Sequence, residues 1–313
     1  MATSRTTAGT PLRSSSKSSS SSSRSAAPLL AYVLHRHDWS ETSLIVELFT
    51  QTLGRVVVVA KGAKRPTSQL RPVLLPFQPV QALLGKAPEQ DHSELRLLRS
   101  AEWVGGVPLL GAAKMFSGFY LNELLLKLLA RQDPHPRLFG LYADTLSALA
   151  TQDDDAPVLR AFELLLLREL GVLPQLNLVT LTAEALQART RYTLSAEAGV
   201  MAVMADADGL SGSEWVALEA ALLHAGGAGH ARALRAAVSA VSATNASTAT
   251  SATSGTGATT ALTATTATTA TTAQAAVLRG LLRAVLHYHL GHARLRTRQV
   301  WLGVQRLAET QPV

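Results

Sequence analysis

The chain has 313 residues, of which 47% are hydrophobic and 16% are charged, and its formal net charge is +7 at pH 7. A chain of this size and apolar content can bury one or two sizeable cores. It contains no cysteine, which excludes disulfides, cysteine-ligated zinc, iron–sulfur clusters and thiol nucleophiles, and favours a reducing, cytoplasmic compartment. Its longest apolar runs are far shorter than the roughly 20 residues needed to cross a bilayer. We therefore expect a soluble protein with no membrane partner.

The first 27 residues are rich in serine and threonine and carry basic but no acidic residues. They superficially resemble an organellar transit peptide, but they lack an amphipathic apolar stripe. Because such a composition has too little apolar bulk to form a core, residues 1–27 are predicted to be a disordered basic tail.

Five short apolar runs follow this tail. They span residues 29–35, 42–49, 55–61, 73–84 and 94–99. No helical segment long enough for a crossover lies between them, which favours a small, closed or nearly closed antiparallel barrel. We therefore predict an α+β protein in which residues 28–105 form a five-stranded oligonucleotide/oligosaccharide-binding (OB) barrel.

The third apolar run leads directly into a basic segment. Val56 to Val59 are β-branched and apolar, as expected of a buried strand, and the chain then passes through Gly62 into a cluster of cations. No Asp or Glu occurs between Leu48 and Pro88, so no carboxylate within this segment neutralises its charge. Such a surface suits a polyanion, above all a nucleic-acid backbone. The predicted phosphate contacts are Arg55, Lys61, Lys64, Arg65 and Arg71.

Exposed cations can also serve solubility alone. The position of this segment favours the nucleic-acid interpretation, because strands 2 and 3 and the connecting loops form the binding surface of OB barrels. Aromatic side chains that could stack on bases are few in this part of the chain: Tyr32, Trp39, Phe49 and Phe77. Strand alternation assigns Phe49 and Phe77 to the core. Binding is therefore expected to depend on phosphates, to be sensitive to salt and to tolerate sequence changes.

The apolar spacing changes after Gly105 from that of strands to that of helices. Residues 106–308 are predicted to form a mostly α-helical bundle domain, with a first helix that ends at Asp133 and a short hairpin within residues 192–203. Residues 242–272 are almost wholly Ala, Thr, Ser and Gly. Because this tract has too little apolar bulk for a core, it is predicted to be an insertion that loops out between two helices.

A second basic region lies near the C-terminus. No acidic residue occurs between Glu219 and Glu309, whereas this span contains eight arginines. The predicted DNA contacts in this region are Arg294, Arg296 and Arg298.

The sequence contains no phosphate-binding loop, no H-E-x-x-H and no G-x-S-x-G motif, so we expect neither an enzyme nor a cofactor. Of His287, His289 and His292, only the last two can share a helix face. Without cysteine or a nearby carboxylate, a basic or packing role is favoured over a metal site. The aspartates at residues 153–155 suggest magnesium, yet their position before Pro157 is more typical of a solvated helix start.

Five short motifs, distributed over both halves of the chain, carry a family resemblance. They are Trp39-Ser40-Glu41-Thr42-Ser43, Ala60-Lys61-Gly62-Ala63, Leu75-Pro76-Phe77-Gln78-Pro79, Gly118-Phe119-Tyr120-Leu121-Asn122-Glu123-Leu124-Leu125 and Leu159-Arg160-Ala161-Phe162-Glu163. With these motifs in this order, residues 28–304 resemble the RecO family of bacterial recombination mediators, apart from the low-complexity tract at residues 242–272.

The resemblance implies an OB barrel packed on a helical domain and binding of single- and double-stranded DNA. It also implies annealing of complementary strands, and joint action with RecR to load RecA onto DNA coated by single-strand DNA-binding protein, at the bacterial nucleoid. Some members hold zinc through four cysteines; this chain has none, so a zinc finger is excluded. Two alternatives remain: a general OB-fold nucleic-acid binder, and a protein-docking scaffold without mediator activity.

The resemblance also implies a partner site. In the RecO family the helical domain receives the acidic, hydrophobic-ended C-terminal tail of single-strand DNA-binding protein, and the matching motif here contains Arg160. A guanidinium can bind a carboxylate through two hydrogen bonds, so Arg160 is the predicted anchor. The alternative is that Arg160 only pairs with residues 153–155 or with Glu163 on the next turn.

Overall fold

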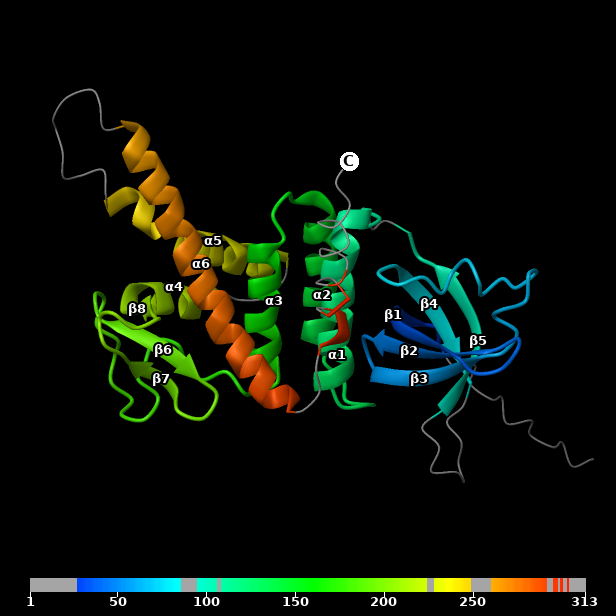
Figure 1. Ribbon diagram of the computed structural model, residues 1–313. Helices are drawn as coiled ribbons and strands as arrows, with labels where there is room; N and C mark the ends of the chain where they lie inside the picture. The colour runs from blue at the N-terminus through cyan, green and yellow to red at the C-terminus, as the bar shows by residue number, and fades with distance from the viewer. Residues whose placement is uncertain are drawn as a thin grey trace, which may run out of the picture.

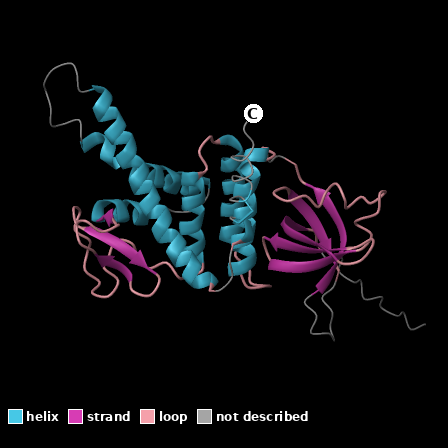
Figure 2. Cartoon of the chain, in the orientation of Figure 1, coloured by secondary structure: helices cyan, strands magenta, loops and turns pink. Residues whose placement is uncertain are grey.

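The computed structural model describes residues 27–85, 95–105, 108–223, 228–248, 260–291, 295–297, 299–300 and 303. Strands gather at the two ends of the molecule and helices lie between them (Figure 2). The N-terminal strands form a barrel on one side, and the helices with a small second sheet form the other side (Figure 1).

The N-terminal strands form a closed barrel of five strands in the order β1-β2-β3-β5-β4. They are β1 (Leu29–Asp38), β2 (Leu44–Thr50), β3 (Gly54–Ala60), β4 (Pro79–Leu84) and β5 (Leu95–Trp103). Only β3 and β5 pair in parallel, while the other four pairs are antiparallel. The predicted fold class, an OB-like barrel followed by a helical region, is thus confirmed.

The fourth strand is shorter than the sequence pattern predicts. The apolar run at residues 73–84 was expected to be one strand, but β4 begins at Pro79. Leu74 is instead fully buried in the barrel core, and Phe77 has a positive φ of 69°. This left-handed backbone conformation ends any strand geometry before β4 and directs the Phe77 ring to the helical side of the barrel.

The helical domain contains six α-helices among the described residues. They are α1 (Met115–Leu128), which follows the 3-10 turn η1 (Ala112–Lys114), α2 (Pro136–Thr151), α3 (Ala156–Glu169), α4 (Gly212–Leu223), α5 (Ala228–Thr248) and α6 (Thr260–Leu290). A three-stranded sheet of order β7-β6-β8 lies among them, with β6 (Arg191–Ser195), β7 (Gly199–Ala202) and β8 (Leu210–Ser211). The hairpin predicted within residues 192–203 corresponds to β6 and β7.

The low-complexity tract differs from its prediction as a loop. Its first residues, 242–248, continue α5, and its last residues, 260–272, form the start of α6. Alanine has the highest helix propensity and threonine tolerates a helix, so the described parts of the tract extend two helices that the apolar pattern places on either side of it. None of the described helices is long and apolar enough to span a membrane.

One apolar core joins the barrel to the helices. Tyr32, Phe49 and Phe77 of the barrel belong to the same buried cluster as side chains of α1 to α6. The Tyr32 ring lies 5.4 Å from that of Phe139 and 5.1 Å from that of Tyr142. Tyr32 is therefore unavailable for base stacking, and the assignment of Phe49 and Phe77 to the core is confirmed.

Candidate nucleic-acid interface

Two loops meet at one end of the barrel. The first is the β1–β2 loop, and the second is the segment of residues 61–71 after β3, here called the basic turn. The Lys64 N–H donates to the Thr42 carbonyl at 2.9 Å, and Lys64 Nζ donates to the Ser40 carbonyl at 3.1 Å. Gly62 has a φ of 70°, which suits glycine and turns the chain from β3 toward the first loop.

Apolar side chains attach the basic turn to the barrel and leave its cations outside. Ala63 is 1% exposed and, together with Leu74, belongs to the barrel core. Lys61, Arg65 and Arg71 are exposed, and none of the three makes an ion pair with another described residue. These three predicted phosphate contacts therefore form an open cationic surface.

Exposed aromatic side chains lie on the same domain. Trp39, in the β1–β2 loop beside the basic turn, has 60% of its surface exposed. Of the four aromatic residues considered from the sequence, it alone keeps its ring available for stacking. Trp103 on β5 is equally exposed, although its indole N–H donates to Gln78 Oε1 at 3.2 Å. Trp103 was not among the residues predicted from the sequence, and the available signal was its position two residues before Gly105.

Arg55 occupies a different environment from the other predicted contacts. Its side chain is only 13% exposed and forms an ion pair with Glu47 of β2 at 3.1 Å. Its Nε and Nη2 donate to the Leu129 carbonyl at the C-terminus of α1, at 3.2 and 3.0 Å. A cation at a helix C-terminus is favourable because the carbonyls there carry partial negative charge. The structure thus places Arg55 in the barrel–helix interface, which corrects its assignment to the DNA surface.

The neutralising carboxylates come from outside the acid-free segment. Glu47, whose side chain is 8% exposed, also pairs with Arg131 at 3.1 Å. Asp38, at the end of β1, pairs with Lys64 at 3.1 Å. The fold brings Glu47 to Arg55 across neighbouring strands and Asp38 to Lys64 of the basic turn, so carboxylates from outside the acid-free segment neutralise these two cations.

Part of the C-terminal basic region lies on the helical domain close to the barrel. The backbone N–H groups of Arg296 and Thr297 donate to the carboxylate of Glu123 on α1, at 2.7 and 2.9 Å. The exposed Arg296 side chain is close enough to β1 to act on His35. Burial, then the neighbouring His37 and the charge of Arg296, lower the pKa of His35. Of the other predicted contacts here, Arg294 and Arg298 lie outside the described residues.

Arg160 is found in the alternative arrangement considered from the sequence. Its Nη2 lies 2.6 Å from Glu163 Oε1, and the Tyr120 hydroxyl donates to the same oxygen at 2.6 Å. Glu163 is fully buried, and this burial raises the pKa of its carboxyl despite the opposing effects of Arg160 and Tyr120. One buried polar atom of each partner, Arg160 Nε and Glu163 Oε2, has no hydrogen-bond partner among the described residues. The anchor role of Arg160 stays a prediction.

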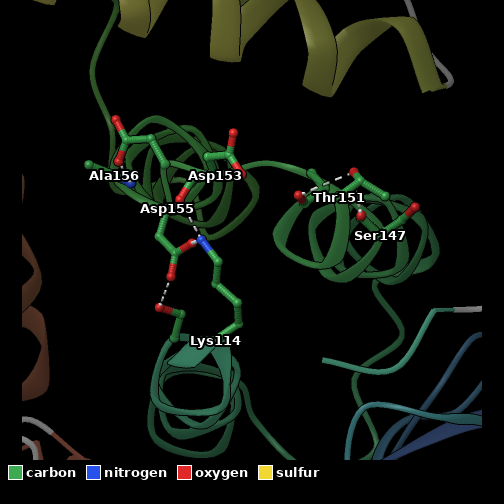
Figure 3. Close-up of polar contacts among 9 residues, drawn as sticks. Lys114, Ser147, Thr151, Asp153, Asp155 and Ala156 are labelled. Atoms are coloured by element: carbon green, nitrogen blue, oxygen red, sulfur yellow. Dashed lines mark hydrogen bonds and ion pairs between the residues drawn. The ribbon is translucent and has the colours of Figure 1, made fainter. Parts of the chain in front are cut away.

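The acidic loop before α3 is bound to the start of α1 (Figure 3). Lys114 Nζ donates to the Asp155 carboxylate and to the Asp153 carbonyl, and Ser117 Oγ donates to Asp155 Oδ2 at 2.5 Å. Asp154 Oδ1 accepts from the Ala156 N–H at 2.9 Å, as at a helix start. Among the described residues, no group of three or more His, Asp or Glu side chains could hold a metal ion.

Comparison with known proteins gives a consistent result along the chain. The family profile "Recombination protein O N terminal" matches residues 29–107, and "Recombination protein O C terminal" matches residues 112–209. Proteins named "DNA repair protein RecO" are similar to this chain. The one from Acidovorax ebreus (strain TPSY) is 44% identical over 285 residues, covering 88% of this chain and 96% of that protein. The one from Polaromonas sp. (strain JS666 / ATCC BAA-500) is 51% identical over 195 residues, which cover 61% of this chain and 76% of that protein.

Proposed function

Because the chain belongs to the RecO family of DNA repair proteins, we propose that it is a recombination mediator. In this role it binds single- and double-stranded DNA and anneals complementary strands. Together with RecR, it helps to load RecA onto DNA coated by single-strand DNA-binding protein. The work is done by binding alone, without covalent chemistry, at the nucleoid in the bacterial cytoplasm.

The observation that carries this proposal is the basic turn. Lys61, Arg65 and Arg71 are exposed and have no ion-pair partner among the described residues. The exposed Trp39 lies in the loop that packs against this turn. Cations attract the backbone of either single- or double-stranded DNA, and an indole ring adds stacking with unpaired bases. This combination supports tight, salt-dependent binding without strong sequence preference.

Annealing requires that two phosphate backbones be neutralised at the same time. A second cationic region supports this step, because Arg296 lies on the helical domain near β1 rather than on the basic turn. Two strands could then be held on one molecule, one at each region. The partner protein's acidic tail is proposed to bind the helical domain at Arg160.

The basic turn is tested by removing its charge. The double variant Lys61→Ala/Arg65→Ala should flatten the dependence of log affinity on log salt by about two units, one for each lost phosphate contact. Adding Lys64→Ala and Arg71→Ala should weaken binding further and slow strand annealing. The measurement is fluorescence anisotropy of labelled DNA over a range of salt concentrations.

A matched control removes the same charge elsewhere. Arg189 and Arg232 are exposed, and both belong to the helical domain, where Arg189 precedes β6 and Arg232 lies on α5. Arg189→Ala/Arg232→Ala should leave the salt slope within a few tenths of a unit of wild type. Equal slopes for the two double variants would show that only net charge matters.

Annealing of DNA coated by single-strand DNA-binding protein separates a mediator from a general DNA binder.

A further inference from the structure

A carboxylate on α1 binds the backbone of the C-terminal basic region. Glu123 accepts from the Arg296 N–H through Oε1 at 2.7 Å and from the Thr297 N–H through Oε2 at 2.9 Å. Lys127, one turn further along α1, pairs with Oε1 at 3.0 Å. Arg296 and Thr297 are helical, and Glu123 binds the N–H groups of both, as an N-cap side chain does at the start of a helix.

The carboxylate is held as an anion in this position. Partial burial of Glu123 raises its pKa, but hydrogen bonds from the N–H groups of Thr297 and Arg296 and from Lys127 lower it more, so the pKa lies below its ordinary value. Leu295, the residue before the capped segment, packs against the main apolar core. The segment is therefore fixed at two points, one apolar and one polar.

This attachment determines where one cation lies. The Arg296 side chain is exposed, and its backbone is bound to α1 next to the barrel strand that carries His35 and Arg36. On the barrel, Arg36 is also exposed. A cation whose backbone is already fixed loses less conformational freedom on binding than one on a free chain end.

We propose that Glu123 is a positioning residue for DNA binding: its carboxylate fixes Arg296 beside β1, where the guanidinium contacts a DNA phosphate. The inference rests on the proposed function, since it assumes that the protein binds DNA. It assigns to Glu123 a role opposite to that expected from its charge. A carboxylate near DNA repels phosphates, so removing it should strengthen binding if charge alone mattered.

The test asks whether removing the Glu123 carboxylate weakens or strengthens DNA binding. Glu123→Ala should weaken single-stranded DNA binding about three- to tenfold at physiological salt and flatten the salt slope by about one unit. Arg296→Ala should cause the same loss. The double variant should be no weaker than either single variant, because both changes remove one contact. As a control, Glu197→Ala removes an exposed carboxylate in the β6–β7 turn and should leave affinity unchanged or slightly raised.

Three results would overturn the proposal: unchanged or tighter DNA binding by Glu123→Ala, fully additive losses in the double variant, or no loss in Arg296→Ala. If Glu123→Ala unfolds at the assay temperature, Glu123→Gln serves instead, since the amide oxygen can still accept one N–H and an intermediate loss is then expected. The proposed function is tested separately by Lys61→Ala/Arg65→Ala. A loss there, with wild-type binding by Glu123→Ala and Arg296→Ala, contradicts this inference only.

Discussion

Arg55 and Arg65 carry the same guanidinium group in opposite surroundings. Arg55 is 13% exposed and binds both Glu47 and the carbonyl that ends α1. Arg65 is exposed on the basic turn and makes no ion pair with another described residue. The charge of one residue is therefore used within the fold, while the charge of the other is available to a ligand.

This difference predicts opposite effects of the same substitution. Arg55→Ala should lower the free energy of unfolding by about 2 to 3 kcal/mol, because it breaks hydrogen bonds to a charged and largely buried partner. Arg65→Ala should change it by less than about 0.5 kcal/mol, as for most surface substitutions. Urea denaturation measures both values. The salt slope of DNA binding should change only in Arg65→Ala; a flattened slope in folded Arg55→Ala would return Arg55 to the DNA surface.

The elements that could be predicted from the sequence are those with a strong local signal. Val56 to Val59 are β-branched and apolar, and they form β3 as expected. Phe77 has an apolar ring but a left-handed backbone conformation. This conformation depends on packing against the helices, so the pattern of apolar residues does not predict it. The pairing of Glu47 with Arg55 could not be predicted from the acid-free run, because it joins residues on neighbouring strands and not residues within that run. The local signal thus gives strands and helices, and contacts between elements decide which charges stay free.

At the scale of elements, residues 242–272 connect and extend two helices. Among the residues whose side chains the structure describes, the last buried one of α5 is Val241 and the first buried one of α6 is Gln274. The described apolar contacts that hold the two helices to the domain are thus made by residues outside the tract. Its composition offers little apolar bulk for further burial.

Replacing residues 242–272 by a short glycine-rich link should therefore preserve the fold. Loop-closure entropy changes only slowly with loop length, so the melting temperature should stay within a few degrees of wild type and DNA affinity should be nearly unchanged. Thermal unfolding followed by circular dichroism, together with DNA anisotropy, measures both. A larger drop in melting temperature would show that the tract itself packs against the domain.

At the scale of the whole molecule, barrel and helices form one packed body. Asn122 of α1 donates to the Leu34 carbonyl of β1 at 2.9 Å and accepts from the Tyr142 hydroxyl of α2, which adds a buried polar link to the shared apolar core. A ligand bound to the barrel and a partner bound to the helical domain are consequently held in a fixed relation. This arrangement suits the proposed mediator role, in which the protein binds DNA and contacts the protein that coats it.

The partner site proposed on the helical domain requires a test that separates binding from folding. Arg160→Ala alone would leave Glu163 buried without its cation, which is strongly destabilising. Glu163→Gln removes that charge and keeps an oxygen that can accept from Tyr120. We therefore compare Glu163→Gln with Arg160→Ala/Glu163→Gln, in both of which position 163 is uncharged.

If Arg160 anchors the acidic C-terminal tail of single-strand DNA-binding protein, the double variant should bind a tail peptide more weakly than Glu163→Gln. The expected loss is on the order of 2 kcal/mol, as for a charge-assisted contact at a hot spot, with little change in binding of free DNA. Isothermal titration with the peptide gives the affinity. Equal affinities would rule out the anchor and direct attention to α6, where Gly280, Arg283, Ala284 and His287 line a shallow groove of about 340 Å³. Arg283→Ala would then be the variant that loses the peptide, because a free carboxylate still needs a cation beside the surface that receives it.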